Sequence, residues 1–274
     1  MGSDDGAPSE DWVPADIDTE RPSPARVYDY VLGGSHNFAV DRQAAEQLLT
    51  VDPHTTLMAH ANRAYLRRVV EYLVNAGVRQ FLDIGSGIPT AGHVHQIAQS
   101  AAPESRVAFV DIDPVAVAHS RQILADNDRT AVIQEDVRRP EQIIDHPDLR
   151  RLLDFEQPVA VLLVALLHYV SDADDPAGIV SRLTGPLAPG SYLALSHGTE
   201  DGPVDMAAMR EIGRRSGIEV TWRNRQQVEA LFAGFDLVEP GVVWVSQWHS
   251  ESPYDAHRDQ PELSANYAGV GRKR

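Results

Sequence analysis

The amino-acid sequence predicts a doubly wound α/β fold, in which helices cover both faces of a largely parallel sheet. From Gln80 onward, short and almost continuously apolar runs alternate with segments of helical periodicity. Such runs are typical of parallel strands, because the connecting helices bury both faces of the sheet. The stretch FLDIGSG at 81–87 adds a second observation, since an apolar run there ends in a glycine turn before the next helix.

Helical periodicity comes first along the chain. The segments DRQAAEQLLTV (41–51) and HANRAYLRRVVEYLVNAG (60–77) carry apolar residues three and four positions apart, and the second ends at a glycine as capped helices do. Residues 23–78 are therefore expected to form a helical segment ahead of the sheet. Residues 1–22 contain three prolines and little apolar periodicity, so we expect a flexible tail.

The expected core spans residues 79–250. Five strands are predicted in the runs FLDIG, RVAFVDID, AVIQEDV, VAVLLVAL and YLALSHG, with helices between them that include 114–126 and 174–190. After the fifth strand the patterns predict a helix at 205–217, a strand at 218–222, a helix at 225–235, and late strands within 236–240 and 242–248. The polar residues 251–274 are expected to form a second tail.

Composition narrows the function classes. The 274 residues include 24 Lys and Arg against 40 Asp and Glu, and a net charge of −16 argues against a broad nucleic-acid surface. The absence of cysteine excludes disulfides and thiolate metal sites. No run reaches the ~18 apolar residues of a membrane span, and no secretory signal is evident, so no membrane partner and a cytoplasmic location are expected. Nothing in the sequence indicates an oligomeric state.

The glycine turn predicts a ligand site. Gly85 and Gly87 lack the Cβ atoms that would block a ligand at the carboxyl end of the strand, and the next helix start offers unpaired N–H groups. A dinucleotide loop would have a third glycine where Thr90 stands, and a Walker loop would end in Gly-Lys-Ser/Thr. A plain turn between strand and helix is the simpler alternative.

The next two strands carry acidic residues at the same edge of the sheet. Asp111 can accept hydrogen bonds from two vicinal ribose hydroxyls, which NAD and S-adenosylmethionine (SAM) both carry. Asp113 precedes Pro114 and is interpreted as a helix N-cap, while Asp136 ends the third strand, in position to meet an adenine amino group. No phosphate-binding cation stands near the glycine loop, which favours a cofactor without a pyrophosphate.

These residues carry a family resemblance. The segments DIGSG, VDIDP, EDV and VLLVALLHYV resemble successive motifs of class I SAM-dependent methyltransferases. PARVYDYVLGGSHNFAVDR, FLDIGSGIPTAGHVHQIA and FAGFDLVEPGVVWVSQW resemble one methyltransferase family found mainly in actinomycetes and described as a domain of unknown function. The resemblance covers residues 22–250 and implies a Rossmann-like seven-stranded sheet and SAM, but no substrate. Pro89 departs from the general pattern, in which many members have a third glycine.

The motif VYDYVLGGSHNFAVDR has two interpretations. Its aromatic residues form one helix face capped by glycines, or the segment is a lid whose aromatic faces attract the sulfonium while an Asn or a backbone N–H holds the methionine carboxylate. The resemblance favours the lid. The predicted cofactor-binding residues are Tyr28, Gly33, Asn37, Phe38, Asp83, Gly85, Gly87, Asp111, Ile112, Asp136, Val137 and Ala165.

Two histidines follow strand carboxyl ends. His168 is expected to line the site, either as a base that takes a proton from the methyl acceptor or only as part of the pocket wall. Asp172, four residues on, would orient the His168 ring if the chain between them is helical. His197 either orients the loop after the fifth strand or contacts ligand. No metal site is predicted.

The sequence thus predicts a SAM-dependent methyltransferase that acts on an unidentified small-molecule acceptor. Two alternatives stay open, namely a non-catalytic protein that binds SAM or S-adenosylhomocysteine (SAH), and a nicotinamide-dependent oxidoreductase.

Overall fold

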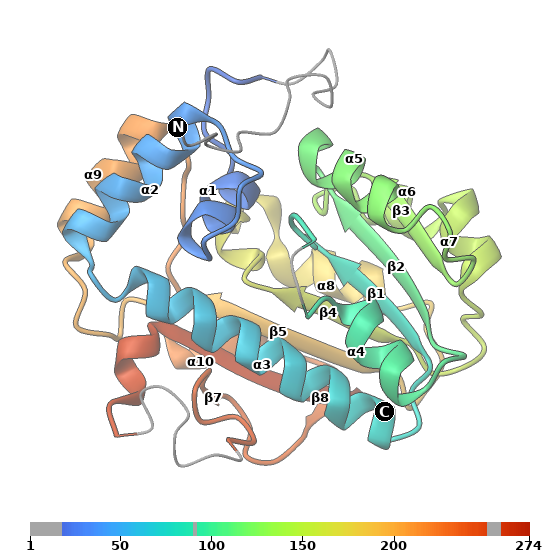
Figure 1. Cartoon of the computed structure of the whole chain (residues 1–274). Coiled ribbons are helices and arrows are strands. Elements are labelled where there is room, and N and C mark those ends of the chain that lie inside the picture. The colour runs from blue at the N-terminus through green and yellow to red at the C-terminus, as the bar shows by residue number, and fades with distance from the viewer. Residues whose placement is uncertain (1–17, 90–91, 251–258) are drawn as a thin grey trace.

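A single eight-stranded sheet organises the chain. Figure 1 shows the arrangement of the elements in the computed structural model. The structure describes residues 18–89, 92–250 and 259–274. The strand order is β3-β2-β1-β4-β5-β8-β6, and β7 pairs with β8 beside this path. The first five strands are mutually parallel, whereas β8 runs antiparallel to β5, β6 and β7. The strands are β1 Gln80–Ile84, β2 Arg106–Asp111, β3 Thr130–Gln134, β4 Ala160–Val164, β5 Tyr192–Gly198, β6 Phe235–Leu237, β7 Val243–Trp244 and β8 Asn266–Lys273.

Helices cover both faces of this sheet, which confirms the doubly wound α/β prediction. One apolar cluster packs α3 and α4 on the sheet, and a second lies on the opposite face with α6, α7, α8 and α10. The α-helices are α1 Pro24–Val31, α2 Ala39–Val51, α3 Thr55–Asn75, α4 Val94–Ala101, α5 Pro114–Ile123, α6 Pro140–Ile144, α7 Pro147–Leu152, α8 Pro176–Thr184, α9 Met206–Ser216 and α10 Arg225–Ala230. Short 3₁₀ turns are η2 Leu167–Tyr169, η3 Asp172–Asp174 and η4 Pro261–Ser264.

The prediction that residues 251–274 form a polar tail is wrong for 266–273. Residues 251–258 lie outside the described residues, but Asn266–Lys273 form β8 in the interior of the sheet. Glycines give this strand a low hydropathy and hide its alternation. They are needed there, because a Cβ on Gly271 would approach the Cβ of Phe235 to 2.7 Å, and one on Gly269 would meet Phe232 at 3.2 Å.

Two late elements also differ from the prediction. Residues 218–222 form no strand, because the place beside β5 is taken by β8. Within 242–248 only Val243–Trp244 form a strand. Val245, whose N–H donates to the Asn266 carbonyl oxygen of β8 (2.8 Å), and Trp248 are buried in the core from irregular backbone. Seven strands follow one another in the sheet, as predicted. The strand beside β5, however, is β8 and not one of the late segments that the sequence predicted. Of the predicted N-terminal tail, 1–17 lie outside the described residues and 18–22 are largely exposed.

Helix α3 belongs to the core, although the sequence placed it in a lid segment. Its Tyr65 hydroxyl lies 2.7 Å from the carbonyl oxygen of Gly269 in β8 and 3.0 Å from that of Leu195 in β5. Helix α9 packs instead on α2 (Figure 1). We call α1, α2, α9 and residues 218–222 the helical cover. No helix among the described residues is long and apolar enough to cross a membrane.

Candidate active site

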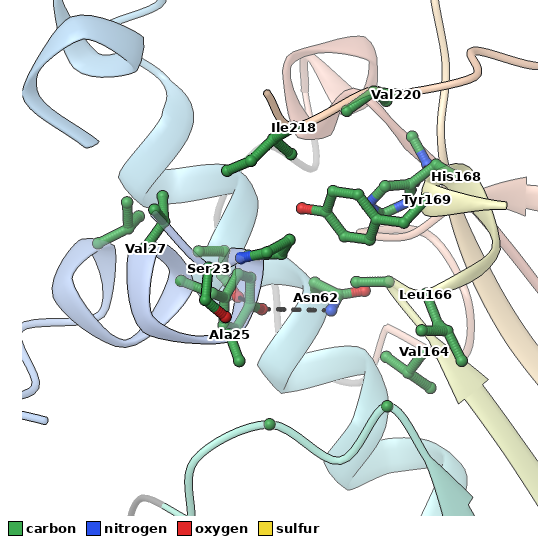
Figure 2. A pocket seen from close by; sticks show the side chains of 18 of the residues that line it. Ser23, Ala25, Val27, Asn62, Val164, Leu166, His168, Tyr169, Ile218 and Val220 are labelled. Atoms are coloured by element: carbon green, nitrogen blue, oxygen red, sulfur yellow. Dashed lines mark hydrogen bonds between the residues drawn. The ribbon is translucent and has the colours of Figure 1, made fainter. Parts of the chain in front are cut away.

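A cavity of about 330 Å³ lies between the carboxyl ends of the strands and the helical cover. Its walls include the residues after β1, β2, β3 and β4, and side chains from α1, α2, α3 and α9. Figure 2 shows side chains from α1, α3, the chain that follows β4 and residues 218–220 around one space. Its volume is at the lower end of the range for small-molecule pockets.

The glycine loop forms one wall of the cavity. Both Gly85 and Gly87 adopt left-handed backbone, with φ of 70° and 66°. A Cβ on Gly85 would approach a terminal methyl group of Leu166 to 2.6 Å, so the leucine would have to move, and the left-handed backbone favours glycine here. Next to Gly87 there is open space, which leaves room for a ligand against bare backbone. Thr90 lies outside the described residues.

Asp111 connects this loop to β2. Its carboxylate accepts hydrogen bonds from the backbone N–H groups of Gly87 (2.7 Å) and Asp113 (2.9 Å), and burial raises its pKa to about 6. Ile112 beside it is 57% exposed although it lines the cavity, so it offers an apolar face to a planar ligand. Asp136 and Val137 line the same end.

The acidic residue between β2 and α5 has the predicted structural role. Asp113 accepts hydrogen bonds from the N–H groups of Val115 (2.8 Å) and Ala116 (3.2 Å), and so caps α5.

Arg63 is a cavity residue that the sequence analysis missed. Its Nε is buried and has no hydrogen-bond partner among the described residues, and its guanidinium lies 5.7 Å from the centre of the Tyr28 ring. Nearby, burial raises the pKa of Asp83 to about 7, an effect that the positive charge of Arg63 opposes. The sequence does indicate that Arg63 faces inward, because it lies on the same face of α3 as the buried Leu66, Val70 and Leu73.

A chain of hydrogen bonds holds the turn after β4. Ser196 in β5 donates to the Asn62 amide oxygen (2.5 Å) and accepts from the N–H of Ala165 (2.9 Å). Asn62 in turn donates to the Tyr28 hydroxyl (3.2 Å), as Figure 2 shows. Ala165 is left-handed, with φ of 55°. The chain therefore links α1, α3 and β5 at a strained turn in the cavity wall.

His168 lines the cavity from η2. Its Nδ1 accepts a hydrogen bond from the backbone N–H of Gly198 (3.3 Å), so the proton of the neutral ring is on Nε2. Burial, and after it the nearby His197 and Arg223, lower its pKa well below the usual value. Nε2 is thus the hydrogen-bond donor of a ring that lines the cavity, which favours a wall position over the base role.

Asp172 does not orient His168, contrary to the sequence expectation. Its carboxylate lies 2.7 Å from Nη2 of Arg223, a buried arginine that the sequence analysis also missed. Arg223 further donates to the carbonyl oxygens of Leu167 and Val170 (2.9 Å each), on either side of His168. Asp172 pairs with Arg223 and not with His168, because the chain between 168 and 172 leaves the helical conformation at Val170.

His197 takes the first of its two predicted roles. Its Nδ1 lies 2.7 Å from the carbonyl oxygen of Gly198 and its Nε2 lies 2.7 Å from Nη1 of Arg223. The arginine is always charged and can only donate, so the neutral ring carries its proton on Nδ1. His197 thereby orients the loop after β5 and does not line the cavity.

One predicted residue of the N-terminal motif lines the cavity, and the others hold α1 and α2 to the rest of the chain. Tyr28 lines the cavity, whereas Gly33, Asn37 and Phe38 do not. Gly33 follows α1 with φ of 81°, and the Asn37 amide donates to the Asp29 carboxylate (2.8 Å). Phe38 packs against a small cluster formed by Ile88, Val115 and Ala116. These contacts hold α1 and α2 to the rest of the chain.

A buried arginine completes that attachment. Arg26 of α1 lies 3.3 Å from the Asp41 carboxylate in α2 and 3.7 Å from the Asp113 carboxylate at the start of α5. All three side chains are almost fully buried. The cover is therefore joined to the sheet domain by ion pairs that water hardly screens.

Comparisons with known proteins agree with this architecture. A DUF574 family protein from Streptomyces avermitilis MA-4680 is 41% identical, with 94% of this chain and 99% of that chain covered and a TM-score of 0.90. For a proposed methyltransferase from Thermobifida fusca YX the identity is 40%, the coverage 96% and 99%, and the TM-score 0.88. No protein of curated function matches the chain.

A more distant structure shares the fold alone. The N-methyltransferase NodS from Bradyrhizobium japonicum WM9 in complex with SAH is 14% identical, with 90% of this chain and 98% of that chain covered and a TM-score of 0.50. The S-adenosyl methyltransferase family model matches residues 10–274, nearly the whole length. The chain therefore belongs to this family of SAM-dependent methyltransferases.

Proposed function

We propose that the chain transfers the methyl group of SAM to a small-molecule acceptor bound in the same cavity. The observation that carries this proposal is the continuity of the cavity, which joins the glycine loop to the space beneath the helical cover. A donor and an acceptor placed side by side in an enclosed space need no further encounter, and alignment supplies a large part of the catalysis.

The strand ends offer the groups that the adenosine half of SAM requires. Asp111 is the proposed acceptor of hydrogen bonds from the two ribose hydroxyls. Ile112 and Val137 offer apolar surface to the adenine ring, and Asp136 an acceptor for its amino group. Gly87 leaves bare backbone for the rest of the cofactor.

The methionine half requires a cation and an anion. Arg63 supplies a guanidinium at the cavity wall whose Nε has no hydrogen-bond partner among the described residues. It suits the carboxylate of SAM better than the predicted Asn37, whose side chain is engaged elsewhere. Asp83 lines the cavity nearby and suits the ammonium group. When bound, SAM supplies an activated methyl group; the protein binds, orients and excludes water.

The helical cover supplies the enclosure. Residues 23–41 are proposed to close over the cofactor, with Ser23, Ala25 and Tyr28 already on the cavity wall. A cytoplasmic location stays a prediction from the sequence.

The proposal is tested by following a labelled methyl group. Wild-type protein is incubated with methyl-labelled SAM and an actinomycete extract separated into small molecules, proteins and nucleic acids. We expect label in the small-molecule fraction. Label confined to the protein or nucleic-acid fraction would overturn the small-molecule acceptor.

A matched pair of variants ties that transfer to the cavity. Gly87→Val puts a branched side chain into the open space beside the loop, whereas Gly77→Val introduces similar backbone strain, with φ of 90°, at the end of α3. We expect only Gly87→Val to abolish SAM binding and transfer. Equal SAM affinity of the two variants would show that the site is misplaced.

A further inference from the structure

The part of the cavity beneath the helical cover has an apolar wall. Aliphatic and thioether side chains from α1, α2, α3 and α9 surround it, together with residues 218–222. These include Val27, Leu48, Met58, Met209, Ile212 and Ile218. We call this part the acceptor compartment.

Charged side chains of the cavity wall are confined to the cofactor side. Among the described lining residues they are Arg63, Asp83, Asp111, Asp113, Glu135 and Asp136, which belong to α3 and the strand ends. A charged acceptor in the compartment would lose its hydration without gaining a counter-charge, and that transfer is costly. The wall therefore selects an uncharged, apolar molecule.

Polar groups gather where the compartment meets the strand ends. The Tyr169 hydroxyl points into the cavity (Figure 2) and has no hydrogen-bond partner among the residues that the structure describes. His168 Nε2, which carries the ring proton, has no protein partner within the same residues. Two neutral donors thus stand beside the place where a methyl acceptor must meet the cofactor.

We propose that the acceptor compartment binds a small, uncharged, apolar molecule with a weakly acidic hydroxyl group, as in a phenol, and presents that oxygen to Tyr169 and His168. This inference rests on the proposed methyl transfer within the same cavity. It names the class of acceptor and the two residues that recognise its oxygen.

The donors suit an oxygen that ionises without a protein base. A phenol has a pKa of about 10, so near neutral pH a small fraction is phenolate, and hydrogen bonds from neutral donors stabilise the anion. The hydroxyl proton passes to solvent water. The phenolate oxygen then forms a bond to the methyl carbon while the carbon–sulfur bond breaks and its electron pair stays on sulfur. The products are a methyl ether, SAH and one proton.

An aliphatic alcohol or a protonated amine would need a base to become a nucleophile. In the described wall of the compartment no carboxylate is present, and the imidazole of His168 offers its N–H. The chemistry of the wall therefore favours the phenol class over these two.

Binding to the SAH-loaded chain tests the compartment. The probes are 2-naphthol and 2-naphthoate, which have one ring system and differ in charge. We expect 2-naphthol to bind at least about tenfold more tightly near pH 7, because it binds uncharged, whereas 2-naphthoate would bring a full negative charge into a compartment whose described wall holds no cation. Equal or tighter binding of 2-naphthoate, or no binding of 2-naphthol, would overturn the inference.

Two variants on one helix locate the site. Met209→Asp puts a charge into the compartment, whereas Ala207→Asp changes an exposed position of α9. We expect Met209→Asp to weaken 2-naphthol binding about tenfold or more with unchanged SAH affinity, and Ala207→Asp to leave both affinities as they are. Unchanged 2-naphthol affinity in Met209→Asp would contradict the placement. Failure of the wild-type chain to bind SAH would contradict the proposed function instead.

Turnover tests the hydroxyl class. We expect SAH release with 2-naphthol to rise about tenfold per pH unit from about pH 6 to pH 8 as the phenolate fraction grows, and to exceed the rate with 2-naphthylmethanol. Equal rates with the two probes, or a pH profile that is flat over this range, would overturn the phenol assignment.

Discussion

The strand ends and the helical cover contribute to one cavity in different ways. At the strand ends the cavity residues are fixed by backbone and buried hydrogen bonds, as for Asp111 and Ala165. In the cover, α9 has no fully buried residue, and its apolar side chains face the cavity half-exposed. The sheet and the cover therefore have different roles at the cavity. The sheet provides a preformed cofactor site, and the cover provides a wall whose side chains can change without disturbing the sheet.

Removing the ion pairs that attach the cover should have the largest effect. Arg26→Met leaves two buried carboxylates, those of Asp41 and Asp113, without their cation. We expect the free energy of unfolding to fall by about 3–5 kcal/mol in chemical denaturation. SAM affinity should fall as well, because α1 carries part of the cavity wall.

The matched control is an exposed ion pair of the same cover. Arg210 in α9 pairs with Glu200 at 2.6 Å, and both side chains are exposed. Arg210→Met should cost at most about 1 kcal/mol. A loss in Arg26→Met no greater than this would mean that the cover is not held by its buried charges.

The cofactor side is tested by Arg63→Met. The variant keeps an apolar stem but removes the guanidinium proposed to bind the methionine carboxylate. A lost charged hydrogen bond is worth about 1.5–3 kcal/mol, so SAH affinity measured by calorimetry should fall about 10- to 100-fold. Arg67→Met, at an exposed position of the same helix, should bind SAH as the wild type does. Equal affinity of the two variants would remove Arg63 from the site.

A smaller effect is expected from pH. Burial raises the pKa of Asp111 from 3.8 to about 6, so its contribution to the stability of the free chain is full below 3.8 and is lost as pH rises through about 6. Binding has the opposite sign, because ribose hydroxyls donate to the ionised carboxylate. SAH affinity should therefore rise by up to about tenfold per pH unit toward pH 6 and then level off for this group.

Asp111→Asn isolates that contribution. Asp83, with a pKa raised to about 7 by burial, ionises in a neighbouring range and stays in the variant. Calorimetric titrations of SAH from about pH 5 to pH 7 should show that the variant lacks the lower ionisation. Identical pH dependence in the two proteins would contradict ribose binding by Asp111.

The fold was predictable wherever periodicity and apolar runs are strong. The parallel strands β1 to β5 and the N-cap at Asp113 were predicted correctly, and the SAM-dependent methyltransferase class, which excludes the nicotinamide alternative, followed from the motifs. β8 was not predicted, because its glycines serve contacts with Phe232 and Phe235 that only the folded chain reveals. Residues 218–222 resemble a strand but line a cavity, where apolar side chains are equally favourable.

Site residues could be predicted where neighbouring residues in the sequence define them, and could not where contacts with distant residues define them. Residues that follow directly on strands, such as Gly87 and Ile112, could be found from the sequence and do line the cavity. Arg223 could not be found from the sequence because its partner Leu167 lies more than fifty positions away. Arg63 is identified only by its position on one face of α3, which its spacing from the other site residues does not reveal. Asp172 was assigned to His168 by helical spacing, although a 3₁₀ turn ends between them.

Hydrogen exchange measured peptide by peptide tests the division between strand ends and cover most directly. SAH alone should slow exchange at 85–87, at 111–113 and in residues 23–41 beyond any global stabilisation, and should leave 206–222 nearly unchanged. Addition of 2-naphthol to the SAH-loaded chain should then slow exchange at 206–222. Protection of 206–222 by SAH alone, or none at 85–87 and 111–113, would contradict a cofactor site at the strand ends and an acceptor site beneath the cover.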